Sequence, residues 1–407
     1  MQEISRYAVG VDVGTSSVKC VVATVDDDGV LTVVGAGQTP NSGMRKGVVV
    51  DLAGPAKAID TVLGEVERMS GYEVNNATIN IGGSHILSTK TDGMIAVGAL
   101  DHEITVEDLD RVDEVAATGK IPANREILDL IPYSYRLDGQ ENIKDPVGMV
   151  GSRLEIKANV VSALKPHCQN VAKAAELANV HIDKMVASAA AAAKSVLNEK
   201  QLENGVALID LGAATTGVVV FEEGELQFIS VLPWGSNNIT MDLAMALKVD
   251  TEVAEEIKRK YASAVSDSSA KEVVFKRDKQ ELYFKRADID EAVEARLEEI
   301  FDGVKKDLKR AGYDRKLPEG VVLVGGGANL KDLAEYVKEH LELSVKLGNP
   351  AKFVNVGAEV EGSEFATAVG LAMTDAVSGG AKGTGKKRSK SSAKKGLVKG
   401  FFAKFKV

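Results

Sequence analysis

The feature that most constrains the fold of this chain is an internal repeat of a short hairpin sequence. The run YAVGVDVGTSSVKCVVATV at 7–25 indicates a strand, a tight turn of glycine and small hydroxyl residues, and a second strand. The run VALIDLGAATTGVVVFEEGELQFISV at 206–231 has the same pattern. At one constant offset, four pairs of positions match: Asp12 with Asp210, Gly14 with Gly212, Ser17 with Thr215, and Val21 with Val219. The repeat predicts two similar domains in tandem.

The composition is that of a globular protein with an uneven charge distribution. A chain of 407 residues, 44% apolar and 27% charged, has room for two or three domains. We expect neither a membrane-spanning helix nor a signal peptide, and we expect reduced thiols in the cytosol. Residues 382–407 carry nine lysines, one arginine and no acidic residue, whereas the net charge of the whole chain is −9. An acidic body argues against binding of nucleic acid.

Hydrophobic periodicity predicts the elements between and after the repeats. Helical spacing predicts helices at 52–70, 105–119, 168–180, 186–197, 238–265, 287–312, 331–342 and 363–377. Alternation predicts strands at 77–87, within 126–162, within 271–284 and at the start of 321–330. Thr105, followed three residues later by Asp108, indicates a capping box. The five histidines show no ligand spacing and are predicted to be ordinary surface or helix residues.

The two turns and a later glycine run are the elements that could carry chemistry. A turn of small residues leaves backbone N–H groups open to phosphate oxygens, and an aspartate at a strand end can hold Mg²⁺ through water. Lys19 on the outgoing strand could reach a phosphate. One such hairpin alone is more often a plain turn. Two of them, together with Gly325–Gly327 after an apolar strand, favour a nucleotide clamp.

Three motifs in this order resemble those of the actin/Hsp70/sugar-kinase superfamily. DVGTSSVK and LIDLGAATT resemble its two phosphate motifs, and VLVGGGANL resembles its adenosine motif. The stretches GMRKGVVVD, IPYSYRLDGQENIKDPVGMVGSRLE, NNITMDLAMAL and AEEIKRKY resemble the FtsA family of bacterial, actin-like proteins, which tether the cell-division ring to the membrane. The resemblance covers nearly all of 6–376, and the tail as well.

The resemblance implies an α/β fold: an actin/Hsp70-like two-domain ATPase with a nucleotide cleft, an inserted 1C (SHS2-type) subdomain and a C-terminal amphipathic helix. The implied boundaries are 1–84, 163–196 and 358–377 for subdomain 1A, 85–162 for 1C, 197–237 and 311–357 for 2A, 238–310 for 2B, 378–393 for a disordered linker and 394–407 for the membrane-targeting helix.

The resemblance also implies ATP and Mg²⁺ as ligands. The matching residues are Asp12, Gly14, Thr15, Ser16 and Lys19 in the first phosphate motif, Asp210, Gly212, Thr215 and Thr216 in the second, Gly325, Gly326, Gly327 and Asn329 in the adenosine motif, and Lys258 beside the adenosine. Asp12 and Asp210 are the candidate catalytic and metal-binding residues.

Two departures from the family pattern bear on activity. Ala213 and Ala214 stand where glycines are usual, and a positive φ at either would be strained. Ser188 opens an alanine run where hydrolysing relatives have a Glu or Gln that orients water, so we expect slow or negligible hydrolysis and a role that is structural first. Close packing between helices is the alternative explanation of the alanine run.

The tail predicts a membrane contact independently of any resemblance. On a helix at 394–407, five apolar side chains fall within an arc of about 140°, with the lysines outside it. These five are Leu397, Val398, Phe401, Phe402 and Phe405. Such a helix lies in the interface of an anionic membrane. Packing back on the body or docking to another protein are the alternatives.

The family's partners complete the hypothesis. Arg296 and Glu299 match residues that contact the C-terminal peptide of the division GTPase FtsZ, although a surface ion pair is the simpler interpretation. The implied partners are FtsZ, further copies of the chain in a filament, anionic lipids and other division proteins, at the cytoplasmic face of the membrane at the division site. A PilM-type pilus-assembly scaffold and a sugar-kinase or Hsp70-type ATPase remain as alternatives.

Overall fold

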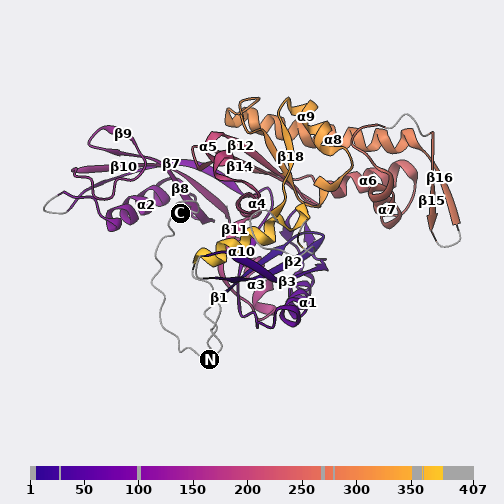
Figure 1. Cartoon of the computed structure of the whole chain (residues 1–407), viewed down its shortest axis with the longest axis horizontal. Coiled ribbons are helices and arrows are strands. Elements are labelled where there is room, and N and C mark those ends of the chain that lie inside the picture. The colour runs from indigo at the N-terminus through magenta and orange to yellow at the C-terminus, as the bar shows by residue number, and fades with distance from the viewer. Residues whose placement is uncertain are drawn as a thin grey trace.

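We describe the protein from a computed structural model, in which residues 6–26, 29–98, 102–266, 271–277, 280–350, 360 and 362–378 are described. The predicted tail helix and all but the first residue of the predicted linker therefore lie outside the described residues. Figure 1 shows an elongated molecule with two large sheets in the middle and a smaller sheet or hairpin at either end. Within the described ranges, no helix is both long and apolar enough to cross a membrane.

The first half is built on a five-stranded sheet of order β11-β6-β1-β2-β3. Its strands are β1 (Arg6–Val13), β2 (Ser17–Val25), β3 (Leu31–Pro40), β6 (Asn76–Ile81) and β11 (His181–Ala187). The first three strands form an antiparallel meander, while β6 lies parallel to both β1 and β11. The helices α1 (Ala53–Ser70) and α3 (Lys165–Leu177) pack together beside this sheet.

The second half repeats this topology in a sheet of order β14-β13-β12-β17-β18. Its strands are β12 (Val206–Leu211), β13 (Thr216–Glu222), β14 (Glu225–Leu232), β17 (Val321–Val324) and β18 (Val345–Leu347). The registers are also equivalent, because Asp12 pairs with Lys19 and Asp210 pairs with Gly217. The tandem repeat predicted from the sequence is therefore confirmed as two sheets of the same topology.

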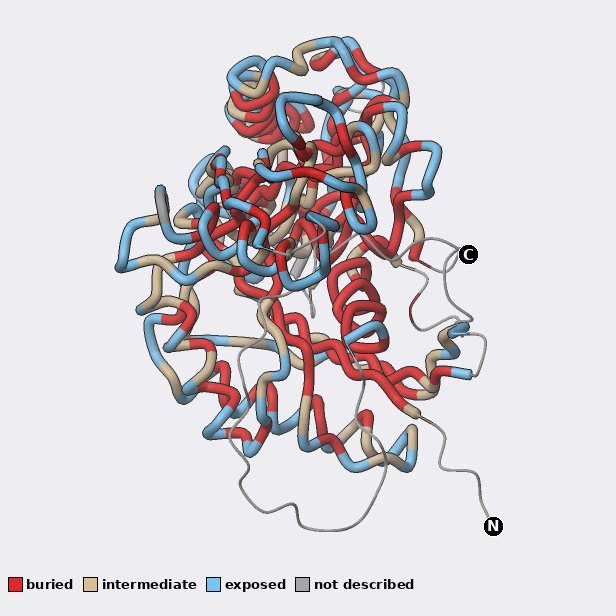
Figure 2. Tube along the Cα trace, turned by 90° about the vertical axis from the view of Figure 1, so that its left-hand side faces the viewer, coloured by how far each residue is buried: buried red, intermediate tan, exposed pale blue. Residues whose placement is uncertain are grey.

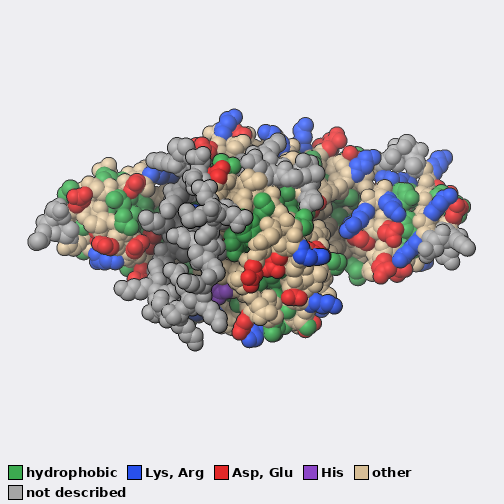
Figure 3. All heavy atoms as spheres, turned by 60° about the horizontal axis from the view of Figure 1, so that its bottom comes forward, with side chains coloured by type: hydrophobic (Ala, Val, Ile, Leu, Met, Phe, Trp, Pro, Cys, Tyr) green, Lys and Arg blue, Asp and Glu red, His purple; other side chains and the backbone are tan. Residues whose placement is uncertain are grey.

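Helices surround the second sheet, and a hairpin extends from them. They are α5 (Glu199–Asn204), α6 (Ser236–Leu247), α7 (Thr251–Tyr261), α8 (Arg286–Ala311), the short helix η1 (Gly326–Asn329) and α9 (Leu333–Leu341). The hairpin of β15 (Glu272–Arg277) and β16 (Gln280–Lys285) lies at one tip of the molecule. Figure 3 shows basic and acidic side chains interspersed at that end, where Arg277 pairs with Glu252 and Lys276 with Glu281.

Two helices pack against each other between the halves: α4 (Ser188–Val196) and α10 (Ala366–Ser378), the latter preceded by η4 (Ser363–Phe365). A Cβ on Gly370 would lie 1.8 Å from the carbonyl oxygen of Ala191, and the hydroxyl of Ser195 donates to the carbonyl of Ala366 at 2.7 Å. Backbones this close leave room for small side chains only. Close helix packing therefore explains the alanine run.

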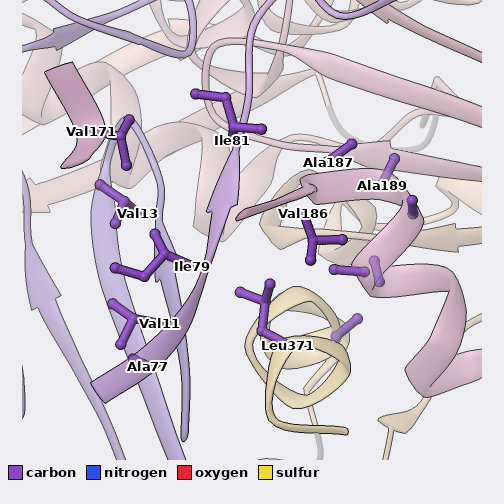
Figure 4. Close-up of a cluster of buried hydrophobic side chains, with 14 of the residues drawn as sticks. Val11, Val13, Ala77, Ile79, Ile81, Val171, Val186, Ala187, Ala189 and Leu371 are labelled. Carbon is purple, nitrogen blue, oxygen red and sulfur yellow. The ribbon is translucent and has the colours of Figure 1, made fainter. Parts of the chain in front are cut away.

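Buried residues form continuous stretches through the middle of the molecule (Figure 2). Figure 4 shows part of this core, in which Leu371 of α10 points towards the strands β1, β6 and β11. Leu371 is fully buried, as are Val11 and Ile79 of the same core. Apolar and small residues alternate along these strands. Both faces of the sheet can therefore be covered by helices.

The insert is a four-stranded sheet of order β7-β10-β8-β9 with one helix packed on it. It contains β7 (Leu87–Ala96), α2 (Val106–Lys120), β8 (Arg125–Leu137), β9 (Gln140–Ile143) and β10 (Arg153–Leu164). Thr105 and Asp108 form the predicted capping box of α2. The insert touches the edge strand β14 of the second half, where the buried amide of Asn159 donates to the carbonyls of Leu226 and Gln227 at 2.8 and 3.1 Å.

Several boundaries differ from the sequence predictions. The strand predicted at 77–87 ends at Ile81, and Leu87 begins a strand of the insert. The predictions of helices at 168–180 and 186–197 missed the strand β11 between them, whose short mixed sequence resembles neither pattern strongly. The single helix predicted at 238–265 is two helices, because Lys248 adopts the left-handed conformation that ends α6.

Candidate functional site

A cleft of about 560 Å³ lies where the turns of the two sheets meet. It is lined by residues 12–17 of the first half, by residues 212–215 of the second and by the glycine run 325–327. Elements from both halves form this one site because the two sheets repeat the same topology, so their first turns face each other. The repeated sequence predicts this arrangement.

The two turns have the same backbone hydrogen bond. The amide of Gly14 donates to the carbonyl of Ser17 at 3.1 Å, and the amide of Gly212 donates to that of Thr215 at 3.0 Å. A Cβ on Gly14 would lie 2.8 Å from the Ser17 carbonyl oxygen, so the turn requires glycine there. Neither Ala213 nor Ala214 has a positive φ, which removes the strain considered for the second turn. Turns of this kind can surround an anion with backbone amides.

Two buried aspartates lie at the bases of the turns. The side chain of Asp12 is 3.8 Å from the ammonium of Lys19 and accepts a hydrogen bond from the amide of Asn80 at 2.7 Å. Burial raises the pKa of Asp12, and Lys19 offsets part of the rise. Burial and the neighbouring Asp12 raise the pKa of Asp210 to about 7, again partly offset by Lys19. Two neighbouring buried carboxylates with one lysine form a site that a divalent cation would stabilise.

The glycine run forms the third wall of the cleft. Gly325 has φ 88°, and a Cβ there would lie 2.4 Å from the carboxylate of Asp210. Around Gly326, by contrast, a Cβ would meet nothing within 4 Å, so its backbone faces open space. The amide of Asn329 donates to the carboxylate of Glu364 at 3.0 Å. The run therefore packs tightly on the second aspartate on one side and leaves bare backbone for a ligand on the other.

Lys258 on α7 is buried and lines the cleft from the second half. Its ammonium lies 2.6 Å from the carboxylate of Glu255 and donates to the hydroxyl of Thr240 at 2.8 Å. Burial lowers the pKa of Lys258, and Glu255 offsets part of this effect. Arg259 shares the same glutamate at 2.9 Å. Glu255 and Arg259 also line the cleft, although no sequence motif predicts either of them as a site residue.

Asn80 is a further cleft residue that the sequence does not predict. It lies at the end of β6, where its amide contacts both Asp12 and the hydroxyl of Ser188 at 3.0 Å, and its oxygen accepts from the amide of Val13 at 2.6 Å. The Ser188 hydroxyl donates in turn to the carbonyl of Ile81 at 3.2 Å. Asn80 thus joins the first turn to the start of α4. No motif marks it, because its role arises only from the parallel pairing of β6 with β1.

Most of the predicted site residues meet in this cleft. Those that line it are Asp12, Gly14, Thr15, Ser16, Lys19, Asp210, Gly212, Thr215, Lys258, Gly325, Gly326, Gly327 and Asn329. Thr216 does not line it, because its buried hydroxyl donates to the carbonyl of Trp234 at 2.8 Å. Arg296 and Glu299 lie on α8, where Arg296 binds Asp242 of α6 at 2.6 and 2.9 Å and also pairs with Glu299. The five apolar tail residues lie outside the described residues.

The histidines are less ordinary than predicted. The rings of His85 and His167 stack with centroids 4.4 Å apart, next to the chain entering and leaving the insert. Burial, followed by His167 and Arg125, lowers the pKa of His85 to about 4.

Among the described residues, no group of three or more His, Cys, Asp or Glu side chains could hold a metal ion by itself. A cation in the cleft would therefore bind through Asp12, Asp210, water and ligand oxygens, which suits Mg²⁺.

The chain is similar in sequence to known cell division proteins. The family described as "Cell division protein FtsA" matches residues 207–370, and "SHS2 domain inserted in FTSA" matches residues 83–162. The chain is 35% identical over 372 residues to the cell division protein FtsA of Pseudomonas aeruginosa, covering 90% of this chain and 89% of that protein. It is 32% identical over 367 residues to FtsA of Bacillus subtilis, covering 89% and 82%.

Solved structures show the same fold at lower identity. A chain of the PilM-PilN type IV pilus biogenesis complex has a TM-score of 0.65 at 18% identity, covering 90% of this chain and 97% of that one. MreB5 of Spiroplasma citri bound to ADP has a TM-score of 0.55 at 12% identity, covering 92% and 98%. The predicted actin-like fold with an SHS2-type insert is confirmed by these matches. The chain belongs to the FtsA family of cell division proteins.

Proposed function

We propose that this chain binds ATP with Mg²⁺ in the cleft and acts as a division scaffold that tethers FtsZ to the membrane. The observation that carries the nucleotide proposal is the pair of equivalent glycine turns, each with its aspartate, that face each other across the cleft. Two sets of backbone amides and two carboxylates suit a triphosphate with its cation. The related fold of MreB5, solved with ADP and with AMPPNP, supports the same ligand class.

Each side of the cleft has its own role in this proposal. The turns at Gly14 and Gly212 hold the phosphates, and Asp12 and Asp210 hold Mg²⁺ through its water shell. The bare backbone at Gly326 lies against the adenosine, with Lys258 beside it. The ion supplies charge neutralisation of the triphosphate when it is bound. The two halves close on the nucleotide because each contributes one turn and one aspartate.

Hydrolysis is slow or negligible in this proposal. Ser188 lines the cleft at the start of α4, and its hydroxyl is already bonded to Asn80 and to the carbonyl of Ile81. A group that orients water for attack needs a free donor or acceptor aimed at the water. The chain therefore uses ATP as a ligand that fixes its shape, and the scaffold role comes first.

The tether needs two further contacts. We assign FtsZ binding to the subdomain of residues 238–310, with Arg296 and Glu299 at the peptide. The pairing of Arg296 with Asp242 supports a fixed guanidinium there. The tail 394–407 binds the inner leaflet, and filament formation through the insert multiplies the weak binding of each tail. The boundaries given above for 1A, 1C, 2A and 2B are part of this proposal.

The test is a recruitment assay with anionic vesicles, Mg²⁺–ATP, a fluorescent FtsZ C-terminal peptide and full-length protein, compared with protein lacking 394–407. We expect the full-length protein to bring the peptide to the vesicles and the protein lacking 394–407 to leave it in solution. If the protein reaches the vesicles and the peptide stays free, the partner is wrong and a pilus-type scaffold gains support. If the protein stays in solution, the tail does not bind membranes. Substitution of Glu299, which is half exposed, provides the matched variant within the peptide site.

A further inference from the structure

A short hairpin, here called the strap, projects from the first half at the turn end of the cleft. It consists of β4 (Met44–Arg45), the tip residues Lys46 and Gly47, and β5 (Val48–Val49). Met44 pairs with Val49, and Arg45 pairs with Val48. Lys46 has φ 49° and Gly47 has φ 78°, the signs of a two-residue turn that matches the twist of its strands. The tip is therefore held in one shape by its own pairing.

The strap tip touches both halves of the protein. A Cβ on Gly47 would lie 2.8 Å from the amide nitrogen of Gly83 in the first half and 3.2 Å from the methyl group of Thr215 in the second turn. A Cβ on Gly82 would lie 3.7 Å from the carbonyl oxygen of Gly47 and 3.5 Å from the hydroxyl of Ser188. Gly47 is buried and lines the cleft. The tip therefore lies in the part of the cleft that also contains Ser188 and the second turn.

The cleft has few cations at this end. Asp12 and Asp210 face one lysine, Lys19, which lies 3.8 Å from Asp12. Elsewhere in the cleft, Lys258 and Arg259 are held by Glu255 at 2.6 and 2.9 Å. A triphosphate brings more negative charge than Mg²⁺ and Lys19 can neutralise. The end at which the phosphates would lie thus has a shortage of positive charge.

The strap can supply the missing charge. Arg45 and Lys46 are both exposed, and within the described residues neither makes an ion pair with a carboxylate. Lys46 is directly bonded to Gly47, which is buried against the second turn. A lysine is a mobile point charge on a long stem, and this suits a phosphate oxygen that arrives with the ligand. Arg45 lies within the paired strand rather than at the tip.

We propose that Lys46 binds the terminal phosphate of the nucleoside triphosphate, so that the strap distinguishes the triphosphate from the diphosphate. The inference rests on the nucleotide binding proposed above. Because Gly47 packs beside both Gly83 of the first half and Thr215 of the second, a strap fixed by the terminal phosphate also holds the two halves together. Loss of that phosphate frees Lys46 and leaves the tip with van der Waals contacts only.

The experiment measures the dissociation constants of Mg²⁺–ATP and Mg²⁺–ADP for the full-length protein and for two matched variants. Lys46→Ala removes the tip charge, and Arg45→Ala removes the neighbouring charge on the same hairpin. For Lys46→Ala we expect ATP binding to weaken by roughly 10- to 100-fold, the range of a lost charge-assisted contact, with ADP binding changed less than about 2-fold. For Arg45→Ala we expect both constants to stay within about 2-fold of the unmodified protein.

A third variant tests how closely the tip packs against the two halves. Gly47→Ala keeps the charge but places a Cβ against Gly83 and Thr215, so we expect it to lose the preference for ATP as well. If the ratio of the two dissociation constants in Lys46→Ala equals that of the unmodified protein, the inference is overturned, whether both affinities are unchanged or both fall by the same factor. If the unmodified protein binds neither nucleotide, the proposed function fails and the inference fails with it. Thermal unfolding of each variant shows whether any loss comes from misfolding instead.

Discussion

The contact between the insert and the second half allows a sharp test of how the molecule is held together. Asn159 is buried on β10, and its amide donates to two carbonyls of the edge strand β14, at 2.8 Å to Leu226 and 3.1 Å to Gln227. Among the described residues, its own carbonyl oxygen has no partner. We consider Asn159→Ala, which removes both donors, and Asn159→Asp, which replaces a donor by an acceptor.

The size of the effect follows from opposing contributions. Two neutral hydrogen bonds contribute about 1 kcal/mol each, and a buried carbonyl oxygen without a partner already costs about 1 kcal/mol or more. Asn159→Ala loses the two bonds and also removes the unsatisfied oxygen, so the expected net loss of stability is about 1 kcal/mol. Asn159→Asp points a carboxylate at two carbonyl oxygens. Burying that charge without a partner should cost at least about 3 kcal/mol at neutral pH.

The assay combines urea unfolding with amide hydrogen exchange in β14. Both variants should lower the free energy of unfolding in the stated order, and exchange should rise at the Leu226–Ile229 amides while β12 stays protected. Ser88→Ala is the matched control, because the amide of Ile229 donates to the Ser88 hydroxyl at a longer 3.3 Å. Equal stabilities for Asn159→Ala and Asn159→Asp would refute the reasoning, because a carboxylate buried against two carbonyl oxygens should cost more than loss of the amide.

Three further predictions concern other parts of the chain. Gly370→Ala should destabilise the protein by more than about 3 kcal/mol or prevent folding, because its Cβ would lie 1.8 Å from a carbonyl oxygen of α4, and expression with thermal unfolding checks this. Burial, then Asp110, raises the pKa of Asp113 to about 7, so its contribution to stability is lost as pH rises from about 4 towards 7. Between pH 5 and pH 8, the free energy of unfolding of Asp113→Asn relative to that of the unmodified protein should therefore rise by about 2 kcal/mol, a value reduced for the partial exposure of the carboxyl group. Thermal unfolding across this pH range measures the difference, and a difference that does not change with pH would contradict the prediction. Arg296→Ala should cost about 1–3 kcal/mol in urea unfolding, because it leaves Asp242 without its 2.6 and 2.9 Å partner, so loss of FtsZ peptide binding must be compared at equal stability.

The parts of the fold that the sequence predicts best are those with strong local patterns. The two hairpins from Tyr7 and Val206 alternate or run apolar for many residues, and each turn is marked by its own glycine. Both form as predicted, with equivalent registers. The capping box at Thr105 is local in the same sense, because its two partners are three residues apart.

The parts that the sequence does not predict depend on contacts between distant residues. The strand β11 is short and half polar, and it is stabilised as a strand by parallel pairing with β6. Asn80 contributes to the site only because β6 lies beside β1, and Glu255 only because α7 packs along the cleft. Thr216 is the converse case. It follows a turn residue in sequence, but the strand alternation directs its side chain away from the cleft.

The two attachments of the insert differ in strength, and this determines how it moves. Where the chain passes from the first half into the insert and back, the guanidinium of Arg125 donates to the carbonyl of His85 at 2.5 Å and to the hydroxyl and carbonyl of Ser162 at 2.9 and 2.8 Å. These three charge-assisted bonds hold the two chain connections to the first half together, whereas the second half is joined by no chain connection and is held by the bonds of Asn159, the bond from Ile229 to Ser88 and the exposed pair Lys144–Glu223. If the cleft opens by rotation of the halves, the weaker attachment breaks first. The insert therefore stays with the first half, and its position relative to β14 reports whether the cleft is closed.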